Sequence, residues 1–298
     1  MGTFNSDLNN KICDMVSPVC VGLSPDWDKI PDELKERFKS SGAVLFVFNK
    51  AIIDAVSDIV PAVCLDFQKY LKYGIGGVVS LRSTIDYAKK KGLTVIVDTG
   101  TDCCLKESYS NGGYSEYKGF EDIASSFLKA PGEDLPEQLR DGAFDADGVT
   151  VGLYSGCGSL NGEEIAKILV RKADRDRGVF FTYKEGAQGS GEILKAAKQA
   201  SDASNGKISI GIYVKGADAK TAQKVRKEVG NAFILTENSS FAGTYFNEGP
   251  ALIIIGDSIM YAYKNEKWAE LYGEKGFADA AREETYDLIS RINDLADM

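Results

Sequence analysis

The residues from Gly92 to Cys104 have the frame of a catalytic strand end but few of the side chains that catalysis uses. Thr94–Val97 is a β-branched run typical of a buried parallel strand, and Asp98 follows it, before a predicted turn that contains Gly100. In a barrel of parallel strands, this edge is where the chemistry takes place. The turn offers no lysine before Lys106, and the chain has no histidine. The usual proton-transfer groups are therefore missing from this strand end.

Thiols are the second chemical feature. Four of the six cysteines are expected near the ends of adjacent strands: Cys64, Cys103, Cys104 and Cys157. Converging thiols could bind zinc or form a redox pair, or they could simply fill space as small apolar side chains. No CxxC spacing occurs, which favours reduced, separate thiols.

Acidic side chains dominate the same predicted edge. Lys184 is the one lysine that we place among the following acids: Asp66, Asp98, Asp102, Glu185, Glu237 and Asp257. The acids could hold Mg²⁺ or Ca²⁺, or they could be solvated rim charges. Lys184 and Glu185 could form an acid–base pair or an ordinary surface ion pair.

The elements that must position these residues alternate between strands and helices. Eight short apolar runs are predicted strands: Val19–Leu23, Ala62–Leu65, Thr94–Val97, Gly148–Gly152, Val179–Tyr183, Ile208–Val214, Phe233–Leu235 and Ala251–Gly256. No strand end carries the GxGxxG turn of a dinucleotide-binding sheet. The pattern therefore predicts an α/β protein, a (β/α)8 TIM barrel formed by a single domain over residues 1–298.

Helical periodicity supports this alternation. Ala43–Ile59, Ile75–Lys91 and the tail Phe277–Leu295 carry apolar residues at helical spacing, including Tyr286 in the tail. The polar stretch Pro131–Asp147 is predicted to be a surface insertion. Ser108–Tyr117, rich in tyrosine, serine and glycine, is either a protein-binding loop or a plain surface loop.

Composition restricts the partners. The formal net charge is -9 and the sequence pI is about 4.8, which argues against nucleic acid or an anionic membrane as a partner. No stretch approaches 18 uninterrupted apolar residues, and the first ten residues are polar. We expect an intracellular protein, in the cytoplasm, without membrane insertion.

Several segments, in order, resemble one enzyme family. They are VCVGLSPDWDKIPDEL (Val19–Leu34), FNKAIID (Phe48–Asp54), KYGIGGVVSLRSTIDYAKKKGLTVIVD (Lys72–Asp98), DGVTVGLYSGCGSL (Asp147–Leu160), GVFFTYKEGAQGSG (Gly178–Gly191) and IIIGDSIMYA (Ile253–Ala262). Together they resemble orotidine 5'-phosphate decarboxylase, in its longer bacterial-type subfamily, which some protists also use. The resemblance implies a TIM barrel, a homodimer with sites near its interface, and a reaction that needs no metal or organic cofactor.

The first three strands depart from the family at its polar positions. Where the family has the aspartate of Gly-x-Asp-Pro, this chain has Ser24, and its Lys-Pro-Gln becomes Cys64, Leu65 and Asp66. In the hallmark Asp-x-Lys-x-x-Asp, Asp98 is kept. Gly100 takes the lysine position and Cys103 the second aspartate position.

The later strands differ in the same way. The pyrimidine-binding Thr-Ser-Asn-Pro is replaced from Glu185 to Gln188, and the phosphate loop from Thr236 to Ala242. Asp257 stands where the family has its phosphate-clamping arginine. Exchanging an attractive for a repulsive charge about 5 Å away changes binding by about 6 kcal/mol at an effective dielectric of roughly 20. We therefore expect the rim to repel a nucleotide monophosphate.

These departures predict a pseudoenzyme: a barrel of decarboxylase descent with no catalytic, cofactor-binding or metal-binding residues of its own. The expected role is structural, as an interaction component of a larger protein assembly. The vestigial pocket positions are Ser24, Cys64, Asp66, Asp98, Gly100, Cys103, Glu185 and Asp257. Two alternatives stay open: an enzyme of different chemistry in the same barrel, and an atypical orotidine monophosphate decarboxylase.

Overall fold

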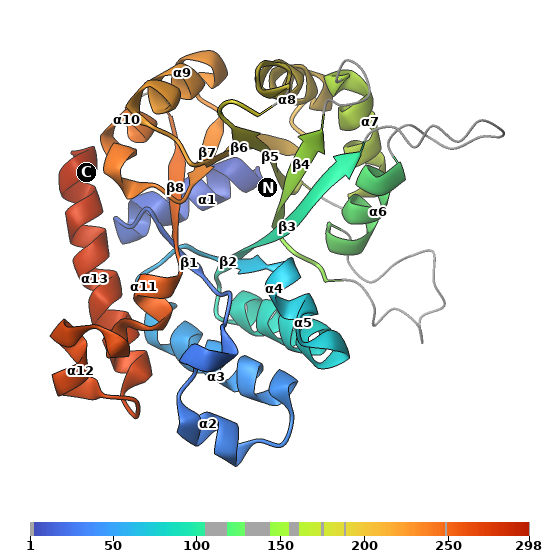
Figure 1. The fold of residues 1–298 in the computed structure, drawn as a ribbon. Coiled ribbons are helices and arrows are strands. Elements are labelled where there is room, and N and C mark those ends of the chain that lie inside the picture. The colour runs from blue at the N-terminus through green and yellow to red at the C-terminus, as the bar shows by residue number, and fades with distance from the viewer. Residues whose placement is uncertain are drawn as a thin grey trace. The chain divides into compact units, whose positions relative to one another are not determined.

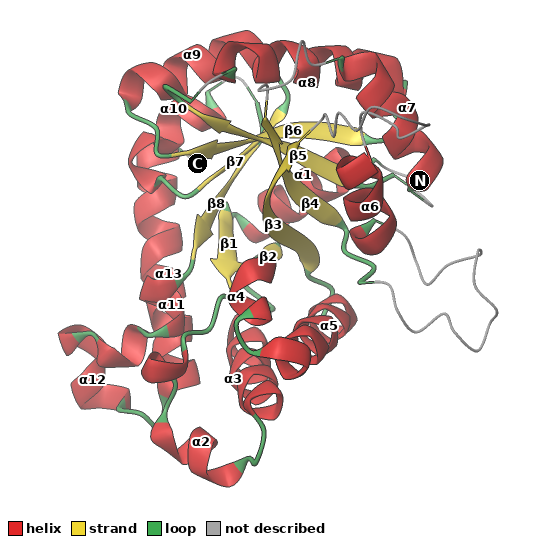
Figure 2. Cartoon of the chain, turned by 45° about the vertical axis from the view of Figure 1, so that its right-hand side comes forward, coloured by secondary structure: helices red, strands yellow, loops and turns green. Residues whose placement is uncertain are grey.

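The computed structural model describes residues 3–104, 118–128, 144–154, 161–173, 176–187, 189–247 and 249–297. Eight strands follow one another in chain order around a closed barrel, and helices alternate with the strands along the chain (Figures 1 and 2). The predicted (β/α)8 TIM-barrel fold is therefore confirmed. The chain divides into two compact units, which we call the β1–β3 unit (residues 10–98 and 252–298) and the β4–β7 unit (residues 1–9 and 99–251). That the chain forms a single domain stays a prediction.

The β1–β3 unit contains four parallel strands in the order β8–β1–β2–β3. These are β8 (Ala251–Ile255), β1 (Val19–Gly22), β2 (Ala62–Asp66) and the first half of β3 (Thr94–Cys104). Their apolar residues are almost wholly buried, as expected for parallel strands that are covered on both faces. At the carboxyl edge, Gly22 pairs with Cys64 and Asp66 pairs with Asp98.

The helices of this unit are α2 (Asp32–Arg37), α3 (Ser41–Val56), α4 (Phe67–Leu71), α5 (Gly74–Lys90), α11 (Asp257–Met260), α12 (Glu266–Tyr272) and α13 (Phe277–Ala296). Side-chain caps set several of their starts. The Ser40 hydroxyl accepts a hydrogen bond from the Ala43 N–H (3.3 Å), and Asp66 caps α4 in the same way. The rings of Phe48 and Phe277 stack at 5.1 Å between centroids, which joins α3 to the start of α13.

The β4–β7 unit contains β4 (Gly148–Tyr154), β5 (Gly178–Lys184), β6 (Ser209–Lys215) and β7 (Phe233–Thr236), each paired in parallel with the next. The second half of β3 belongs to the same unit, and the Thr99 hydroxyl donates to the Thr150 carbonyl of β4 (2.8 Å). The helices are α6 (Lys118–Phe127), α7 (Gly162–Lys172), α8 (Ser190–Ser204), α9 (Ala219–Val229) and α10 (Ala242–Phe246). Asn161 caps α7 and Asp218 caps α9.

The first helix, α1 (Phe4–Met15), was not predicted. Its apolar residues Phe4, Leu8 and Ile12 recur every four positions and are buried, so the signal was present in a segment otherwise dominated by polar residues. The Phe4 ring packs edge-on against Phe180 of β5 at 6.1 Å between centroids. A Cβ at Gly178 would lie 2.3 Å from the Phe4 ring, so only glycine fits there.

Two predictions about element ends were wrong. The strand at Thr94 does not stop before a turn at Gly100, because β3 continues to Cys104. Tyr286 does not lie on the buried face of the last helix. It is 46% exposed, whereas Glu284 and Thr285 are buried, and the Trp268 indole donates to Glu284 (2.8 Å).

Several predicted segments lie outside the described residues. These are Ser108–Tyr117, most of Pro131–Asp147, Cys157 and the side chains of residues 101–104. Within the part of the chain that the structure describes, no helix has the length and apolar character needed to cross a membrane.

Candidate functional site

The carboxyl edge of the β1–β3 unit brings two acids together. Asp66 ends β2, and its register partner on β3 is Asp98, which is only 8% exposed. Burial raises the pKa of Asp66, and the negative charge of Asp98 raises it further, although the Lys69 backbone N–H, which donates to the Asp66 carboxylate (3.2 Å), acts in the opposite direction. The site therefore holds a pair of carboxyl groups, one of which takes up a proton more readily than a free aspartate.

The loop after β1, residues 23–30, is fixed by tyrosines. The Tyr70 hydroxyl donates to the Leu23 carbonyl (2.9 Å), and the Tyr261 hydroxyl accepts from the Asp26 N–H (2.6 Å). Two further tyrosines bond to the backbone of this loop: Tyr73, at Pro25 and Trp27, and Tyr263, at Lys29. Ser24 lies within this loop and is half-buried. The segment thus has the contacts of a fixed structural loop.

Asp257 is paired with a lysine that the sequence reasoning missed. Lys29 Nζ lies 2.5 Å from Asp257 Oδ2 and 5.0 Å from the centroid of the Tyr261 ring. The hydrogen bond to Asp257 raises the pKa of Lys29. No sequence motif marks Lys29, because it follows β1 by seven residues and ends a single turn of 3-10 helix, Trp27–Lys29. The parallel pairing of β1 with β8 brings the segments that follow these strands together and places Lys29 beside Asp257.

The carboxyl edge of the β4–β7 unit carries a pair of lysines. Lys184, the last residue of β5, is the register partner of Lys215, the last residue of β6. Paired residues of parallel strands point to the same face of a sheet. Lys215 Nζ also lies 4.6 Å from the centroid of the Tyr213 ring. Lys184 was predicted at this edge because it directly follows an apolar run. Lys215 also directly follows an apolar run, but it was not predicted.

The acids of this edge have their own partners. Glu185 accepts a hydrogen bond from the Tyr183 hydroxyl and lies 3.4 Å from Lys224 Nζ. The hydrogen bond from Tyr183 lowers the pKa of Glu185, and the charge of Lys224 lowers it further. Glu185 therefore pairs with Lys224 of α9, not with Lys184 as predicted. In the same way Glu237 accepts from the Tyr213 hydroxyl.

The prediction of an acidic rim with a single lysine is therefore wrong. Lys29, Lys215 and Lys224 accompany Lys184 at the strand ends or beside their acids. Chain topology, not sequence distance, brings Lys29 and Lys224 to their partners, which lie 228 and 39 residues away.

Gly100 occupies an unusual backbone position within β3. Its φ angle is +58°, in the left-handed region where glycine is favoured and other residues are strained. The difference from the family pattern at this position, glycine instead of lysine, thus involves the backbone as well as the side chain. A lysine placed there would have to adopt a strained conformation or move the strand.

The described residues show only part of the region where a metal or thiol site was left open as an alternative. Among the residues that the structure describes, no three side chains of histidine, cysteine, aspartate or glutamate gather as a metal site. Cys64 is buried in the middle of β2, but the side chains of Cys103, Cys104 and Cys157 lie outside the described residues. A converging thiol group stays a prediction.

The strand order and the site at the carboxyl edges define the class of protein: a (β/α)8 barrel of the TIM type. No protein-family model matches the chain. The chain is 28% identical to an orotidine 5'-phosphate decarboxylase of Petrotoga mobilis, over 91% of this chain and 91% of the relative. It is 26% identical to that of Clostridium acetobutylicum, over 89% and 90%.

Solved structures agree in fold. The orotidine monophosphate decarboxylase of Leishmania donovani superimposes with a TM-score of 0.64 at 17% identity and covers 100% of both chains. A putative decarboxylase from Streptomyces avermitilis has a TM-score of 0.67 at 14% identity, over 100% of this chain and 97% of the other. The chain is thus a homologue of proteins named orotidine 5'-phosphate decarboxylase, with whose family its residues share the resemblance described above.

Proposed function

We propose that this chain is a barrel of decarboxylase descent that no longer decarboxylates a nucleotide and that serves as a structural or interaction component of a protein assembly. The observation that carries this proposal is Gly100. In the family pattern that the chain resembles, this position holds the lysine that protonates the product carbon. Here it has no side chain, and its backbone is set at φ +58°.

Asp257, at the position of the family's phosphate-clamping arginine, supports the same proposal. The expected loss of phosphate binding energy is smaller than the sequence alone indicated. Replacing an arginine by Asp257 removes an attraction of about 3 kcal/mol at about 5 Å, for an effective dielectric of roughly 20. Lys29 neutralises the carboxylate, so the added repulsion largely disappears. The expected loss of phosphate affinity is then a factor of about 100, instead of the factor of about 10,000 that corresponds to 6 kcal/mol.

One observation favours a second candidate, an atypical orotidine monophosphate decarboxylase. The register-paired Lys184 and Lys215 place two ammonium groups at one strand edge, and Asp98 is kept at another. Lysines delivered from β5 and β6 could replace the cation that β3 no longer supplies.

Turnover separates the two candidates. The purified full-length chain, incubated with orotidine 5'-monophosphate, is expected to release no carbon dioxide above background. Turnover well above background would overturn our first proposal. In that case Lys184→Ala and Lys215→Ala should abolish it, whereas Lys195→Ala, an exposed lysine of α8, should not.

The assembly role needs its own measurement. Calorimetry with uridine 5'-monophosphate, with and without Mg²⁺, tests whether the chain still binds nucleotides, and we expect no micromolar affinity. Native purification from the source cells should recover the chain in a complex with other proteins. Recovery only as a bare monomer or homodimer would contradict the assembly role.

A further inference from the structure

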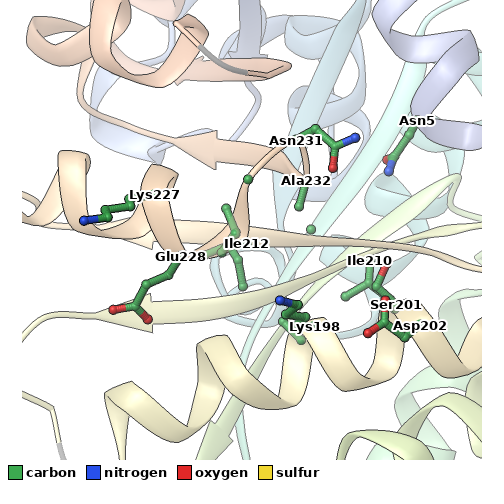
Figure 3. A pocket seen from close by; sticks show the side chains of 14 residues that line it. Asn5, Lys198, Ser201, Asp202, Ile210, Ile212, Lys227, Glu228, Asn231 and Ala232 are labelled. Carbon is green, nitrogen blue, oxygen red and sulfur yellow. The ribbon is translucent and has the colours of Figure 1, made fainter.

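Three exposed apolar side chains gather at the end of α4 and the start of α5. Leu71 is 46% exposed, Ile75 is 85% exposed and Val79 is 58% exposed. Ile75 and Val79 are four residues apart in one helix, so they lie on the same face of α5. A cavity of about 540 Å³ beside β6, in the other unit, differs because its isoleucines, Ile210 and Ile212, are 3% and 0% exposed (Figure 3). Leu71, Ile75 and Val79, which we call the α4–α5 face, are therefore open to a partner, whereas the isoleucines of the cavity are not.

The α4–α5 face is held in place by tight packing on the other sides of α5. A side chain at Gly77 would clash with the Tyr70 carbonyl of α4, and one at Gly42 of α3 would clash with the Gly76 carbonyl. The backbone of α5 therefore lies directly against both neighbouring helices and cannot turn its exposed side chains inward. Neighbouring apolar side chains that a fixed helix holds in solvent are typical of a contact site with another molecule.

Positive charge accompanies the α4–α5 face. Residues 67–79 contain Lys69 and Lys72 and no acidic residue, whereas the whole chain has a formal net charge of -9. Both lysines are exposed. Lys72 Nζ lies 5.7 Å from the centroid of the Tyr73 ring. This surface is therefore basic and apolar on an acidic protein, and the partner complementary to it is acidic and apolar.

Two other occupants fit this charge less well. In a two-fold contact with a second copy, the face would meet itself, so Lys72 would approach basic residues. The acid of α5 that could compensate, Asp86, already pairs with Arg82 (3.0 Å). An anionic membrane would attract the two lysines but repel a chain whose net charge is -9.

We propose that the α4–α5 face binds an amphipathic helix of another protein. Apolar residues of that helix, spaced three or four apart, contact Leu71, Ile75 and Val79. Acidic residues beside this apolar stripe pair with Lys69 and Lys72. The inference rests on the proposed role as an interaction component of an assembly, and it specifies the chemistry of the partner.

The test uses two synthetic peptides of about 20 residues, long enough to form a helix in water. Both carry leucine on one helical face. The first has glutamate on the flanks of this face, and the second has lysine at the same positions. Titrated with the full-length chain and followed by fluorescence anisotropy, the glutamate peptide should bind saturably, by a factor of about 10 or more tighter than the lysine peptide, and more weakly in high salt. Absence of saturable binding of the glutamate peptide up to about 1 mM would overturn the proposal.

Variants locate the binding. The double variant Ile75→Ser, Val79→Ser should weaken binding of the glutamate peptide by a factor of about 10 or more. The double variant Lys69→Glu, Lys72→Glu should reverse the preference between the two peptides. Leu271→Ser is the matched control, because Leu271 is 70% exposed on α12, and it should leave binding unchanged. Melting temperatures check that each variant is folded. Equal binding by the serine double variant and by the control would overturn the proposal.

Two further measurements separate the other occupants. A dimer in sedimentation that dissociates in the Ile75→Ser, Val79→Ser variant but not in Leu271→Ser would assign the face to a second copy. Binding to vesicles of phosphatidylserine and phosphatidylcholine that the same variant abolishes would assign it to a membrane. Either result would overturn the proposal. The proposed function is tested separately by turnover and by native purification, so a complex that survives the serine substitutions would overturn this inference alone.

Discussion

The carboxyl edges of the two compact units hold their tyrosines in different ways. In the β1–β3 unit, tyrosine hydroxyls bond to backbone groups of the loop after β1, as Tyr70 does to Leu23. In the β4–β7 unit, the hydroxyls of Tyr183 and Tyr213 bond to the carboxylates of Glu185 and Glu237, which are exposed to solvent. A backbone partner cannot turn away, whereas an exposed carboxylate can turn to water or to a ligand. The first edge is therefore fixed structure, and the second remains free to rearrange.

The largest expected difference between the edges comes from removing one hydroxyl in each. Tyr70→Phe leaves the Leu23 carbonyl without its donor and one Asn49 amide N–H without its acceptor, in a buried site, so the free energy of unfolding should fall by about 2 kcal/mol. Tyr213→Phe removes the hydrogen bond to the exposed Glu237 and should cost about 0.5 kcal/mol. Urea unfolding of both variants checks this. Equal losses would remove the distinction between a fixed and an adaptable edge.

The next effect concerns Gly100. Gly100→Lys forces a side chain onto a left-handed backbone, so we expect a loss of about 1 to 2 kcal/mol in the free energy of unfolding and no decarboxylation of orotidine 5'-monophosphate. Gly92→Lys is the matched control, because Gly92 has φ +82° with open space around it. The two variants should lose similar stability. A Gly100→Lys variant that is as stable as the unmodified chain and turns over the nucleotide would contradict the claim that the backbone at this position opposes a catalytic lysine.

A pH series tests the carboxyl pair. The pKa of Asp66 is raised above its usual 3.8 in the folded state, so its charged form carries a penalty that is present above the folded-state pKa. This penalty fades as the pH falls through the folded-state pKa toward 3.8. Asp66→Asn keeps a cap for α4 and should be more stable than the unmodified chain at pH 7, by less than the Tyr70 effect. Its advantage should disappear below pH 4, as measured by thermal unfolding. An advantage that persists unchanged at that pH would show that Asp66 is not the titrating group.

The smallest effect is expected from the exposed ion pair. Lys29→Met removes the partner of Asp257 and should cost about 0.5 kcal/mol, a loss that shrinks in 0.5 M salt. Lys224→Met, which removes the ion-pair partner of Glu185 in the other unit, should show the same dependence on salt. The loss of stability in urea, measured at low and high ionic strength, is the readout. A loss at Lys29 that does not depend on salt would assign its role to contact with the Tyr261 ring instead.

The sequence predicted the strands better than it predicted their ends. All eight apolar runs are strands, because burial on both faces of a parallel sheet leaves a short, continuous apolar signal. The end of β3 was missed because Gly100 usually indicates a turn, whereas here it lies within the strand. The helix α1 was missed because only three of its twelve residues are buried apolar ones.

The site was less predictable for a physical reason. Which residues stand at strand ends follows in part from the sequence: Asp66 and Lys184 end β2 and β5 as predicted, whereas Asp98 lies within β3. Which side chains meet depends on which strands are neighbours in the sheet, so the pairing of Asp257 with Lys29 and of Glu185 with Lys224 required the structure. A count of charges along the sequence therefore overstated the negative charge at the carboxyl edges of the strands.

The backbone at Gly100 also bears on evolutionary history. If an ancestor carried a lysine there in an ordinary strand conformation, the change to glycine permitted a twist that lysine tolerates poorly. Reversal would then require at least two coupled changes, one that restores the strand and one that restores the amine. In such a lineage the backbone conformation at this one residue would oppose a return to lysine, even without selection against it.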